Sequence, residues 1–213
     1  MYNILKRCLD IFISIVATAL LLPVFVILCI MIKLGSKGPA IFRQARAGKD
    51  GKTFTLYKFR TMRTGVDPFG ASPKSGEDPR LTGFGKFMRE YSLDELPQLM
   101  NVLKGDMSIV GPRPLYVSQM AEWDRQQRKR LLVKPGLTGL AQISGRAALT
   151  REQKLQLDVK YVESACFWND IKIIIATLGQ IFSRKSIYEQ KYSEHEYTRG
   201  QNGDTENKDV NGN

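Results

Sequence analysis

The amino-acid sequence begins with a long run of apolar residues. Ile11 to Ile32 contains no charged side chain and is rich in Ile, Leu and Val. Because an α-helix rises about 1.5 Å per residue, a straight helix of this length would cross the roughly 30 Å hydrocarbon core of a bilayer. One prediction is therefore a single transmembrane anchor. A cleaved signal peptide fits less well, because no small-residue cleavage site follows the run before Lys33.

Two features of this run favour a helix that enters the membrane and returns on the same side. Pro23 lies near the middle, where proline removes a backbone N–H and clashes with the preceding turn. Both ends of the run are basic, with Lys6, Arg7, Lys33 and Lys37. The positive-inside rule draws both ends to the cytoplasmic side. A re-entrant helix broken at Pro23 and a spanning helix both remain open, and Asp10 is expected at the interface, paired with Lys6 or Arg7.

The remaining pattern predicts a mainly helical domain with one small β-hairpin. Ala40–Gln44 and Thr53–Tyr57 alternate as strands do, and the Gly48–Gly51 turn joins them. The sequence predicts helices over Gly83–Arg89, over Leu96–Leu103, with Pro97 at its first position and Gly105 just past its end, and over the strongly basic Ser118–Leu132. Apolar residues at helical spacing predict two more, Glu152–Val162 and Phe167–Phe182. The apolar stripe of the last helix suits either a membrane interface or a protein core. Val66–Pro79 is expected to be a loop.

Charge and composition narrow the chemistry. The 213 residues carry a net charge of +11, and because the polar tail from Glu194 is acidic, the positive charge belongs to the part before it. This balance favours anionic partners such as nucleic acid, acidic lipid or phosphorylated substrates. The single histidine, His195, lies in the tail, which argues against His-based zinc sites and serine triads. Carboxylate, hydroxyl, Lys/Arg and hard-metal chemistry remain.

Two adjacent carboxylates, Asp94 and Glu95, form the first candidate site. Ser92 and Glu95 have the spacing of a capping box, which would be a purely structural role. Pro97, however, fits the first turn of a helix that begins after the carboxylates. The positive end of such a helix favours ionised carboxylate or phosphate. Adjacent side chains point in different directions, so the pair suits a division of labour in which one carboxylate attacks and the other holds a cation.

Two further segments are candidates for binding phosphate. Arg113 stands between two prolines in GDMSIVGPRP (105–114), which gives a rigid guanidinium fork or simply a stiff surface turn. The segment KPGLTGLAQISGR (134–146) ends at Arg146, and its glycines allow close backbone approach to a phosphate. It matches neither a Walker A nor a GxGxxG pattern. YKFRTMR (57–63) adds Lys58, Arg60 and Arg63, which could form the edge of a basic surface.

The ordered combination of YKFRTM, SLDELPQLMNVLKGDMSIVGPRP and KPGLTGLAQISGR, behind a proline-broken apolar helix, resembles the bacterial sugar transferase family. These are monotopic polyprenyl-phosphate phosphoglycosyl transferases. The likeness runs from about Lys6 to Arg184 and is strongest to small single-domain members, such as those that start glycan assembly with a diacetylbacillosamine phosphate. One departure is Leu22, which stands before Pro23 where the family usually has serine.

The resemblance implies a fold and a location. We expect a mainly α fold with a small β-hairpin. A re-entrant membrane helix would occupy 1–33, and interfacial helices would pack on a compact cytoplasmic catalytic domain over 34–190. A disordered polar tail would follow over 191–213. The protein would sit monotopically on the cytoplasmic (inner) membrane.

The resemblance also implies an activity. A UDP-sugar would give its sugar 1-phosphate to polyprenyl (undecaprenyl) phosphate and release UMP, with Asp94 as the covalent nucleophile and Glu95 as a Mg²⁺ ligand. Arg113 and Arg146 match motif positions expected to bind phosphate, and Arg89 is a further candidate. The expected partners are the UDP-sugar, polyprenyl phosphate and the bilayer, and not nucleic acid. A membrane-associated phosphatase or pyrophosphatase, a basic nucleic-acid-binding protein and a membrane adaptor remain alternatives. The sequence identifies neither the sugar nor the oligomeric state.

Overall fold

The computed structural model describes residues 1–66, 73 and 75–183, apart from the side chains of Arg146 and of residues 181–183. The longer elements are α1 (Tyr2–Gly35), β1 (Ile41–Ala47), β2 (Thr53–Phe59), α2 (Gly83–Glu90), α3 (Gln98–Lys104), α5 (Arg151–Glu163) and α6 (Phe167–Ser183). The shorter ones are β3 (Ser108–Val110), β4 (Gly136–Thr138), α4 (Leu140–Ile143) and the 3₁₀ helices η1 (Lys49–Gly51), η2 (Leu93–Glu95), η3 (Val117–Glu122), η4 (Gln127–Leu132) and η5 (Arg146–Ala148). The fold is thus mainly helical, as predicted. The expected tail over 191–213 lies outside the described residues, as does part of the expected loop before Pro79.

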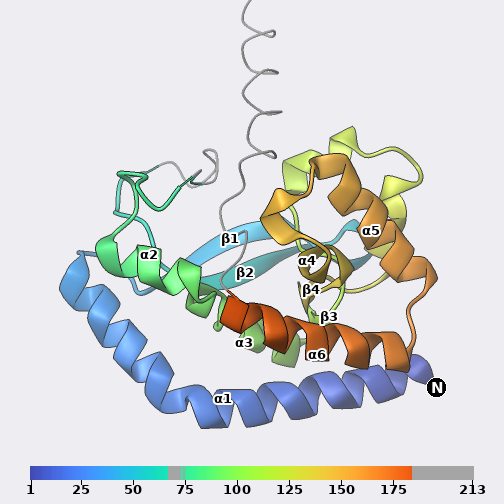
Figure 1. Cartoon of the computed structure of the whole chain (residues 1–213), viewed down its shortest axis with the longest axis horizontal. Coiled ribbons are helices and arrows are strands. Elements are labelled where there is room, and N and C mark those ends of the chain that lie inside the picture. Colours follow the sequence, from blue (N-terminus) through green and yellow to red (C-terminus); the bar gives the residue numbers. More distant parts are fainter. Residues whose placement is uncertain (67–72, 74, 184–213) are drawn as a thin grey trace, which may run out of the picture.

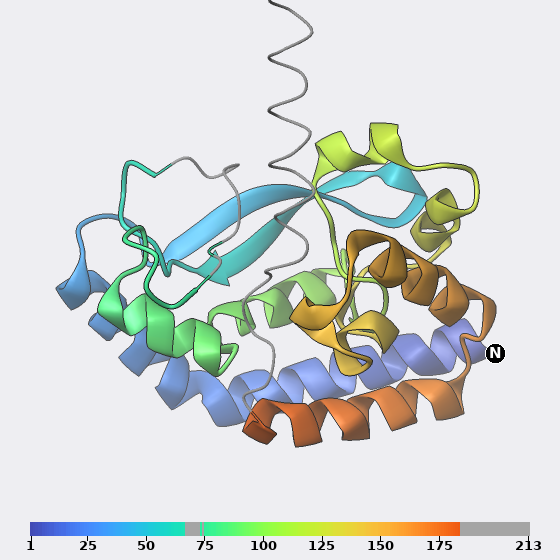
Figure 2. The ribbon, with the colours of Figure 1, turned by 45° about the horizontal axis from the view of Figure 1, so that its top comes forward.

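The helix α1 forms one side of the molecule, and α6 runs beside it (Figures 1 and 2). The β-hairpin and α5 lie on the other side of this helical layer in both views. On α6, Ile173 is buried while Trp168, Ile175 and Leu178 are exposed. One face of the helix therefore packs on the core, and another presents apolar side chains outward.

Among the described residues, α1 alone is long and apolar enough to cross a membrane. Its most apolar 18-residue window has a mean hydropathy of 3.0, and 11% of that window is buried. The helix bends partway along (Figure 1), and Pro23 lies inside it. A proline inside a helix removes one backbone hydrogen bond and is the usual cause of such a bend. The chain therefore stays helical on both sides of Pro23, with a bend where the sequence predicted a break.

One prediction for α1 is wrong. Asp10 is 4% exposed, and its carboxylate accepts hydrogen bonds from Ser108 and Ile109 rather than pairing with Lys6 or Arg7 at an interface. Buried carboxylates require hydrogen-bond partners, and β3 supplies them.

The predicted hairpin is confirmed, with both strands slightly longer than expected. β1 and β2 are antiparallel, from Ile41 opposite Phe59 to Ala47 opposite Thr53. The turn uses positive φ angles at Asp50 (57°) and at the following glycine, a region open to Gly and tolerated by Asp. Leu56 on β2 belongs to the main hydrophobic core, together with residues of α3, β3, α5 and α6.

A second, parallel strand pair was not predicted. β3 pairs with β4 at Ser108 opposite Gly136 and Val110 opposite Thr138. Each strand has only three residues, too few to show an alternating pattern. The two chains approach so closely that a Cβ added at Gly136 would lie 2.1 Å from the backbone nitrogen of Gly111. Glycine is therefore required at the first residue of β4.

The predicted helix Ser118–Leu132 is also wrong. The segment forms the two 3₁₀ helices η3 and η4, which are separated at Trp123. The Trp123 side chain is 4% exposed, and the Arg130 guanidinium lies over its ring at 4.7 Å. The backbone of Trp123 is extended (φ −82°, ψ 132°), which ends η3 and prevents one continuous helix through the segment.

Candidate active site

Charged side chains from four segments meet beside η2. Lys58 comes from β2, Arg89 from the last turn of α2, and Arg113 from the segment after β3. The carboxylates of Asp94 and Glu95 come from η2 itself. The structure thus brings together five residues that are scattered over 56 positions of sequence.

The backbone before the carboxylates has an unusual conformation. Ser92 takes a φ of 57°, and its side chain does not cap η2. The capping-box alternative therefore fails, because Glu95 is bonded elsewhere. The following helix α3 begins at Gln98 with Pro97 at its N-cap, so the carboxylates precede it as predicted. A left-handed conformation at a non-glycine residue costs free energy, and such residues concentrate at functional sites.

Glu95 is held by two cations. Its Oε1 accepts from Arg113 Nη2 at 2.6 Å and from Lys58 Nζ at 3.1 Å, and its Oε2 accepts from Arg113 Nη1 at 3.3 Å. Burial alone would raise the pKa of the Glu95 carboxyl, but the charges of Arg113 and Lys58 and their hydrogen bonds outweigh it. They hold this pKa well below its ordinary value, so Glu95 is a permanent anion.

Asp94 has a different environment. The residue is 7% exposed, and within the described part of the chain no group forms a hydrogen bond to its carboxylate. Burial raises the pKa of the Asp94 carboxyl, and the charges of Lys58, Arg89 and Arg113 act against this. Its oxygens are therefore unbonded, partly desolvated and close to positive charge. These are the properties of a carboxylate that can attack a phosphorus atom.

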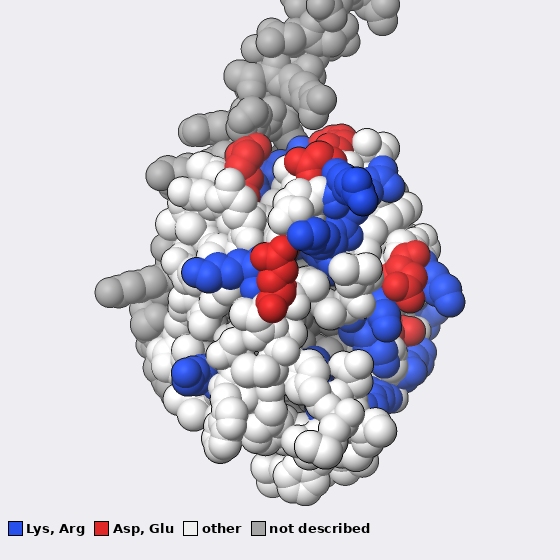
Figure 3. Space-filling model, turned by 90° about the vertical axis from the view of Figure 1, so that its right-hand side faces the viewer, with Lys and Arg blue, Asp and Glu red and all other residues white. Residues whose placement is uncertain are grey.

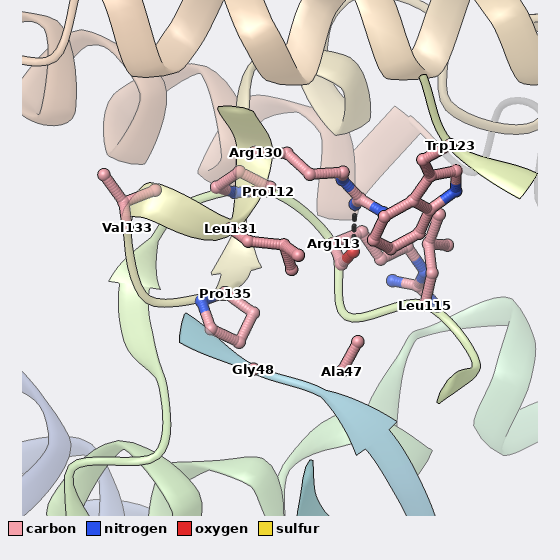
Figure 4. A pocket seen from close by; sticks show the side chains of 10 residues that line it. All are labelled: Ala47, Gly48, Pro112, Arg113, Leu115, Trp123, Arg130, Leu131, Val133 and Pro135. Atoms are coloured by element: carbon pink, nitrogen blue, oxygen red, sulfur yellow. Dashed lines mark hydrogen bonds between the residues drawn. The ribbon is translucent and has the colours of Figure 1, made fainter. Parts of the chain in front are cut away.

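A buried ion pair holds the backbone of Arg113. Arg130 Nη2 donates to the Arg113 carbonyl oxygen at 2.6 Å and lies 2.7 Å from Asp158 Oδ2 on α5. Figure 4 shows this bond beside the Trp123 ring, at a small recess lined by Ala47, Gly48, Pro112, Arg113, Leu115, Trp123, Arg130, Leu131, Val133 and Pro135. Burial raises the pKa of the Asp158 carboxyl to about 6, although the charge of Arg130 opposes the rise. Arg113 thus has a fixed backbone as well as two rigid prolines beside it.

The other predicted cations differ in their placement. Arg89 donates from Nε to Thr61 Oγ1 at 2.9 Å. The Arg146 side chain lies outside the described part of the structure, although its backbone belongs to η5. Arg60 is structural, because its guanidinium donates to the backbone carbonyls of Ser36 and of the residue after it.

Sequence reasoning missed the role of Lys58. It was read as part of a basic surface, whereas it lies against Glu95 with a side-chain exposure of 20%. Burial lowers the pKa of the Lys58 ammonium, and the Glu95 charge opposes this. The sequence did contain a signal for this role. Lys58 lies two residues after Leu56 and therefore on the same face of β2, and Leu56 is buried. A lysine on the inward face of a strand needs an anion as partner.

The expected Mg²⁺ ion would have to be bound by a small set of carboxylates. No group of three or more His, Cys, Asp or Glu side chains suited to a metal occurs in the described residues. Mg²⁺, however, is usually held by one or two carboxylates together with substrate phosphates and water. Glu95 uses three of about four acceptor positions on its carboxylate, all toward Lys58 and Arg113. About one acceptor position therefore remains on Glu95, so a Mg²⁺ ion there would take at most one oxygen from Glu95 and its other ligands from a substrate diphosphate and water.

Comparison with known proteins identifies a family for the chain. A family model described as bacterial sugar transferase matches residues 1–184. The sugar transferase EpsL of Bacillus subtilis is 43% identical over 193 residues, which cover 89% of this chain and 93% of that relative. The UDP-glucose:undecaprenyl-phosphate glucose-1-phosphate transferase of Escherichia coli is 40% identical over 87% of this chain. The undecaprenyl-phosphate galactose phosphotransferase of Salmonella typhimurium is 38% identical over 86% of this chain.

The relatives differ in length. The match covers 42% of the Escherichia coli protein and 42% of the Salmonella protein. The chain therefore spans about two fifths of these relatives but nearly all of the Bacillus protein. All of η2, β3 and the basic segments described above fall within the family match.

Proposed function

The chain belongs to the bacterial sugar transferase family, and we propose that it transfers a sugar 1-phosphate from a UDP-sugar to polyprenyl phosphate and releases UMP. The first support comes from its relatives, a UDP-glucose:undecaprenyl-phosphate glucose-1-phosphate transferase and an undecaprenyl-phosphate galactose phosphotransferase. The second is the site itself, in which three cations (Lys58, Arg89 and Arg113) outnumber the two carboxylates of Asp94 and Glu95. Such a site favours an anionic substrate.

In this proposal Asp94 is the nucleophile. Its carboxylate oxygen attacks the sugar-bearing phosphorus of the UDP-sugar, forming an O–P bond while the bond from that phosphorus to the bridging oxygen breaks. UMP leaves with the bridging oxygen, and the sugar phosphate stays on Asp94. An oxygen of polyprenyl phosphate then attacks the same phosphorus and frees Asp94. Because the two substrates are both anions, using one site in turn avoids holding them together.

The cations around Asp94 would stabilise charge on the transferred group. Arg113 offers a rigid fork that suits phosphate oxygens, and Lys58 adds a point charge next to Asp94. Glu95 keeps both cations in place. We assign Mg²⁺ binding to Glu95, together with substrate oxygens. A bound Mg²⁺ would neutralise charge on the diphosphate.

We place the chain on the cytoplasmic face of the membrane with α1 re-entrant. Most large side chains of α1 are exposed, including Phe12, Leu20, Ile27 and Leu34. The end view in Figure 3 is almost free of charged side chains in its lower part, on the side of α1 and α6, while Lys, Arg and acidic residues gather above. The bend in α1 and the basic residues at both its ends support a path that returns to one side.

One observation carries the proposed reaction: a buried Asp94, whose carboxylate accepts no hydrogen bond from the described residues, lies next to a Glu95 that two cations hold. The test uses the full chain in nanodiscs, a panel of UDP-sugars and a polyprenyl phosphate. UMP release should depend on one UDP-sugar, and labelled UMP should exchange into that sugar nucleotide without acceptor. Asp94→Asn should abolish both, whereas Asp124→Asn, at an exposed carboxylate, should leave both intact.

The product distinguishes a transferase from a hydrolase. With polyprenyl phosphate present, a transferase yields lipid-linked sugar, and a phosphatase or pyrophosphatase yields free sugar phosphate. With the acceptor withheld, mass spectrometry should find a sugar-phosphate adduct on Asp94. Robust UMP exchange by Asp94→Asn would reject the covalent mechanism.

A further inference from the structure

The first turns of α1 carry polar side chains on one face of an otherwise apolar helix. Tyr2, Lys6 and Asp10 follow each other at intervals of four residues, which places them on one side of a helix. Asp10 is 4% exposed, and Ser14, one turn further, is fully buried. This face therefore packs against the rest of the chain.

Asp10 binds the beginning of β3. Its Oδ1 accepts from Ser108 Oγ at 3.0 Å and from the backbone N–H of Ile109 at 2.9 Å. β3 leads after Val110 directly into the turn that carries Arg113. The carboxylate thus satisfies a buried backbone donor at the base of a catalytic segment.

A second polar cluster binds the end of β3. Asp170 on α6 accepts from Lys6 Nζ at 2.7 Å and from the Tyr2 hydroxyl at 2.8 Å. Its other oxygen accepts from the Tyr161 hydroxyl at 2.7 Å, and that hydroxyl also lies 3.2 Å from the carbonyl oxygen of Val110. Both ends of β3 are therefore connected to the same face of α1.

Arg7 connects α1 to the other catalytic segment. Its Nη1 donates to the carbonyl of Val102 at 2.6 Å, and its Nη2 donates to the carbonyl of Leu103 at 2.9 Å. These carbonyls belong to the last turn of α3, where a cation is favoured by the helix dipole. Asp94 and Glu95 lie immediately before the other end of α3.

We propose that the N-terminal half of α1 is a positioning element of the active site: Asp10 and Lys6 fix β3, and thereby Arg113, while Arg7 fixes α3, and thereby the Asp94–Glu95 pair. The consequence for rate rests on the proposed function. The positive-inside rule accounts for basic residues near the end of α1 but not for turning charged side chains toward the protein, which has a cost. Their bonds to β3 and α3 explain why these side chains face inward.

The test compares three variants of the full chain in detergent. Asp10→Leu makes α1 more apolar, so membrane insertion is not weakened, but it leaves Ser108 and Ile109 without their acceptor. Asp10→Asn keeps an acceptor oxygen at the same place. Ser14→Ala is the matched control, because its buried hydroxyl has no hydrogen-bond partner among the described residues.

Two measurements are made on each variant. The first is amide hydrogen exchange of peptides covering residues 108–116 and 94–104. Asp10→Leu should accelerate exchange of the first peptide about tenfold or more, and Asp10→Asn and Ser14→Ala should not. The second is UMP exchange, in which Asp10→Leu should lower kcat by about 10- to 100-fold per folded molecule with little change in KM. A merely stabilising residue would lower the melting temperature without lowering kcat per folded molecule.

If Asp10→Leu does not fold, Arg7→Met provides a second test of the same proposal. It should accelerate exchange of the 94–104 peptide and lower kcat, again with KM retained. Unchanged hydrogen exchange, or unchanged kcat per folded molecule, in the variant that folds would overturn the inference. If the wild-type chain exchanged no UMP with any UDP-sugar, the proposed function would fail instead, and hydrogen exchange would still decide whether α1 holds these segments.

Discussion

Asp94 and Glu95 are neighbours in the chain, yet burial raises the pKa of the Asp94 carboxyl while Arg113 and Lys58 hold the pKa of the Glu95 carboxyl well below its ordinary value. The difference arises because both cations donate hydrogen bonds to Glu95 and neither donates one to Asp94. The site therefore combines two adjacent carboxyl groups whose pKa values are displaced in opposite directions. The pH dependence of the proposed reaction should report on Asp94.

The rate of UMP exchange should rise with pH along an acid limb, because attack requires the ionised form of Asp94. Lys58→Met removes a positive charge that lowers the Asp94 pKa, so the midpoint of the limb should move to higher pH. Glu95→Gln removes a negative charge that raises it, so the midpoint should move to lower pH. Profiles of kcat against pH measure both shifts, even where the rates themselves are low.

Arg63→Gln is the control for this pair. Arg63 is exposed and lies in the same sequence motif as Lys58, so its removal should leave the midpoint in place. Midpoints that move in the same direction in Lys58→Met and Glu95→Gln would show that the acid limb does not belong to Asp94.

The sequence predicted those parts of the fold that are determined by residues close together in the chain. The hairpin was predicted by alternation around the Gly48–Gly51 turn, and α3 by Pro97 and Gly105 at its two ends. The Asp94–Glu95 pair was visible for the same reason, because two carboxylates before a helix form a local pattern. The resemblance to the family then gave expected roles in the reaction to Asp94, Glu95 and Arg113, which the local patterns had already indicated as candidates.

The missed features are pairs that join distant positions. Lys58 meets Glu95 across 37 residues, and Asp10 meets Ile109 across 99. A charged residue in an apolar context shows that it needs a partner, but not which one. The sequence therefore placed Lys58 and Asp10 at surfaces, whereas folding buries each against a partner from another motif.

Replacing Arg113 by Lys should show that the guanidinium fork matters beyond its charge. Lys keeps the charge but lacks the planar fork with which Arg113 bonds Oε2 of Glu95 from Nη1 and Oε1 from Nη2. The loss of one charge-assisted hydrogen bond, about 1.5 to 3 kcal/mol, should lower kcat/KM by about 10- to 100-fold. Arg125→Lys, at an exposed arginine, serves as the control. If Arg113→Lys kept the wild-type kcat/KM, the positive charge of Arg113 would matter for the reaction and the shape of its guanidinium group would not.

The two tryptophans allow a direct test of membrane contact. Trp168 on α6 is 71% exposed beside the apolar face, and Trp123 is buried at the recess that contains Arg113. In nanodiscs with brominated acyl chains, quenching should be retained in Trp123→Phe and lost in Trp168→Phe. The measurement needs no substrate. Quenching that follows Trp123 instead, or equal emission with and without bromine, would show that α6 faces water.

Variants of the ion pair between Arg130 and Asp158 should distinguish its effect on the stability of the fold from its effect on the position of Arg113. Asp158→Asn leaves the Arg130 charge buried without its counter-ion and should reduce the free energy of unfolding by about 3 to 5 kcal/mol. In Arg130→Met the Asp158 carboxyl loses its cation. Its pKa, already raised to about 6, should rise further, so the destabilisation should grow as the pH rises above that value.

The double variant Arg130→Met/Asp158→Leu should then recover most of the stability, because replacing both partners of a buried pair by apolar side chains is often neutral or favourable. Its UMP exchange should nevertheless stay well below that of the wild type. The reason is that the Arg113 carbonyl has lost the donor that lies 2.6 Å from it, and the guanidinium that holds Glu95 is no longer fixed at its backbone. Thermal unfolding and kcat measured on the same samples separate the two effects. If the double variant regained the wild-type kcat as well as the wild-type melting temperature, Arg130 would stabilise the fold without positioning Arg113.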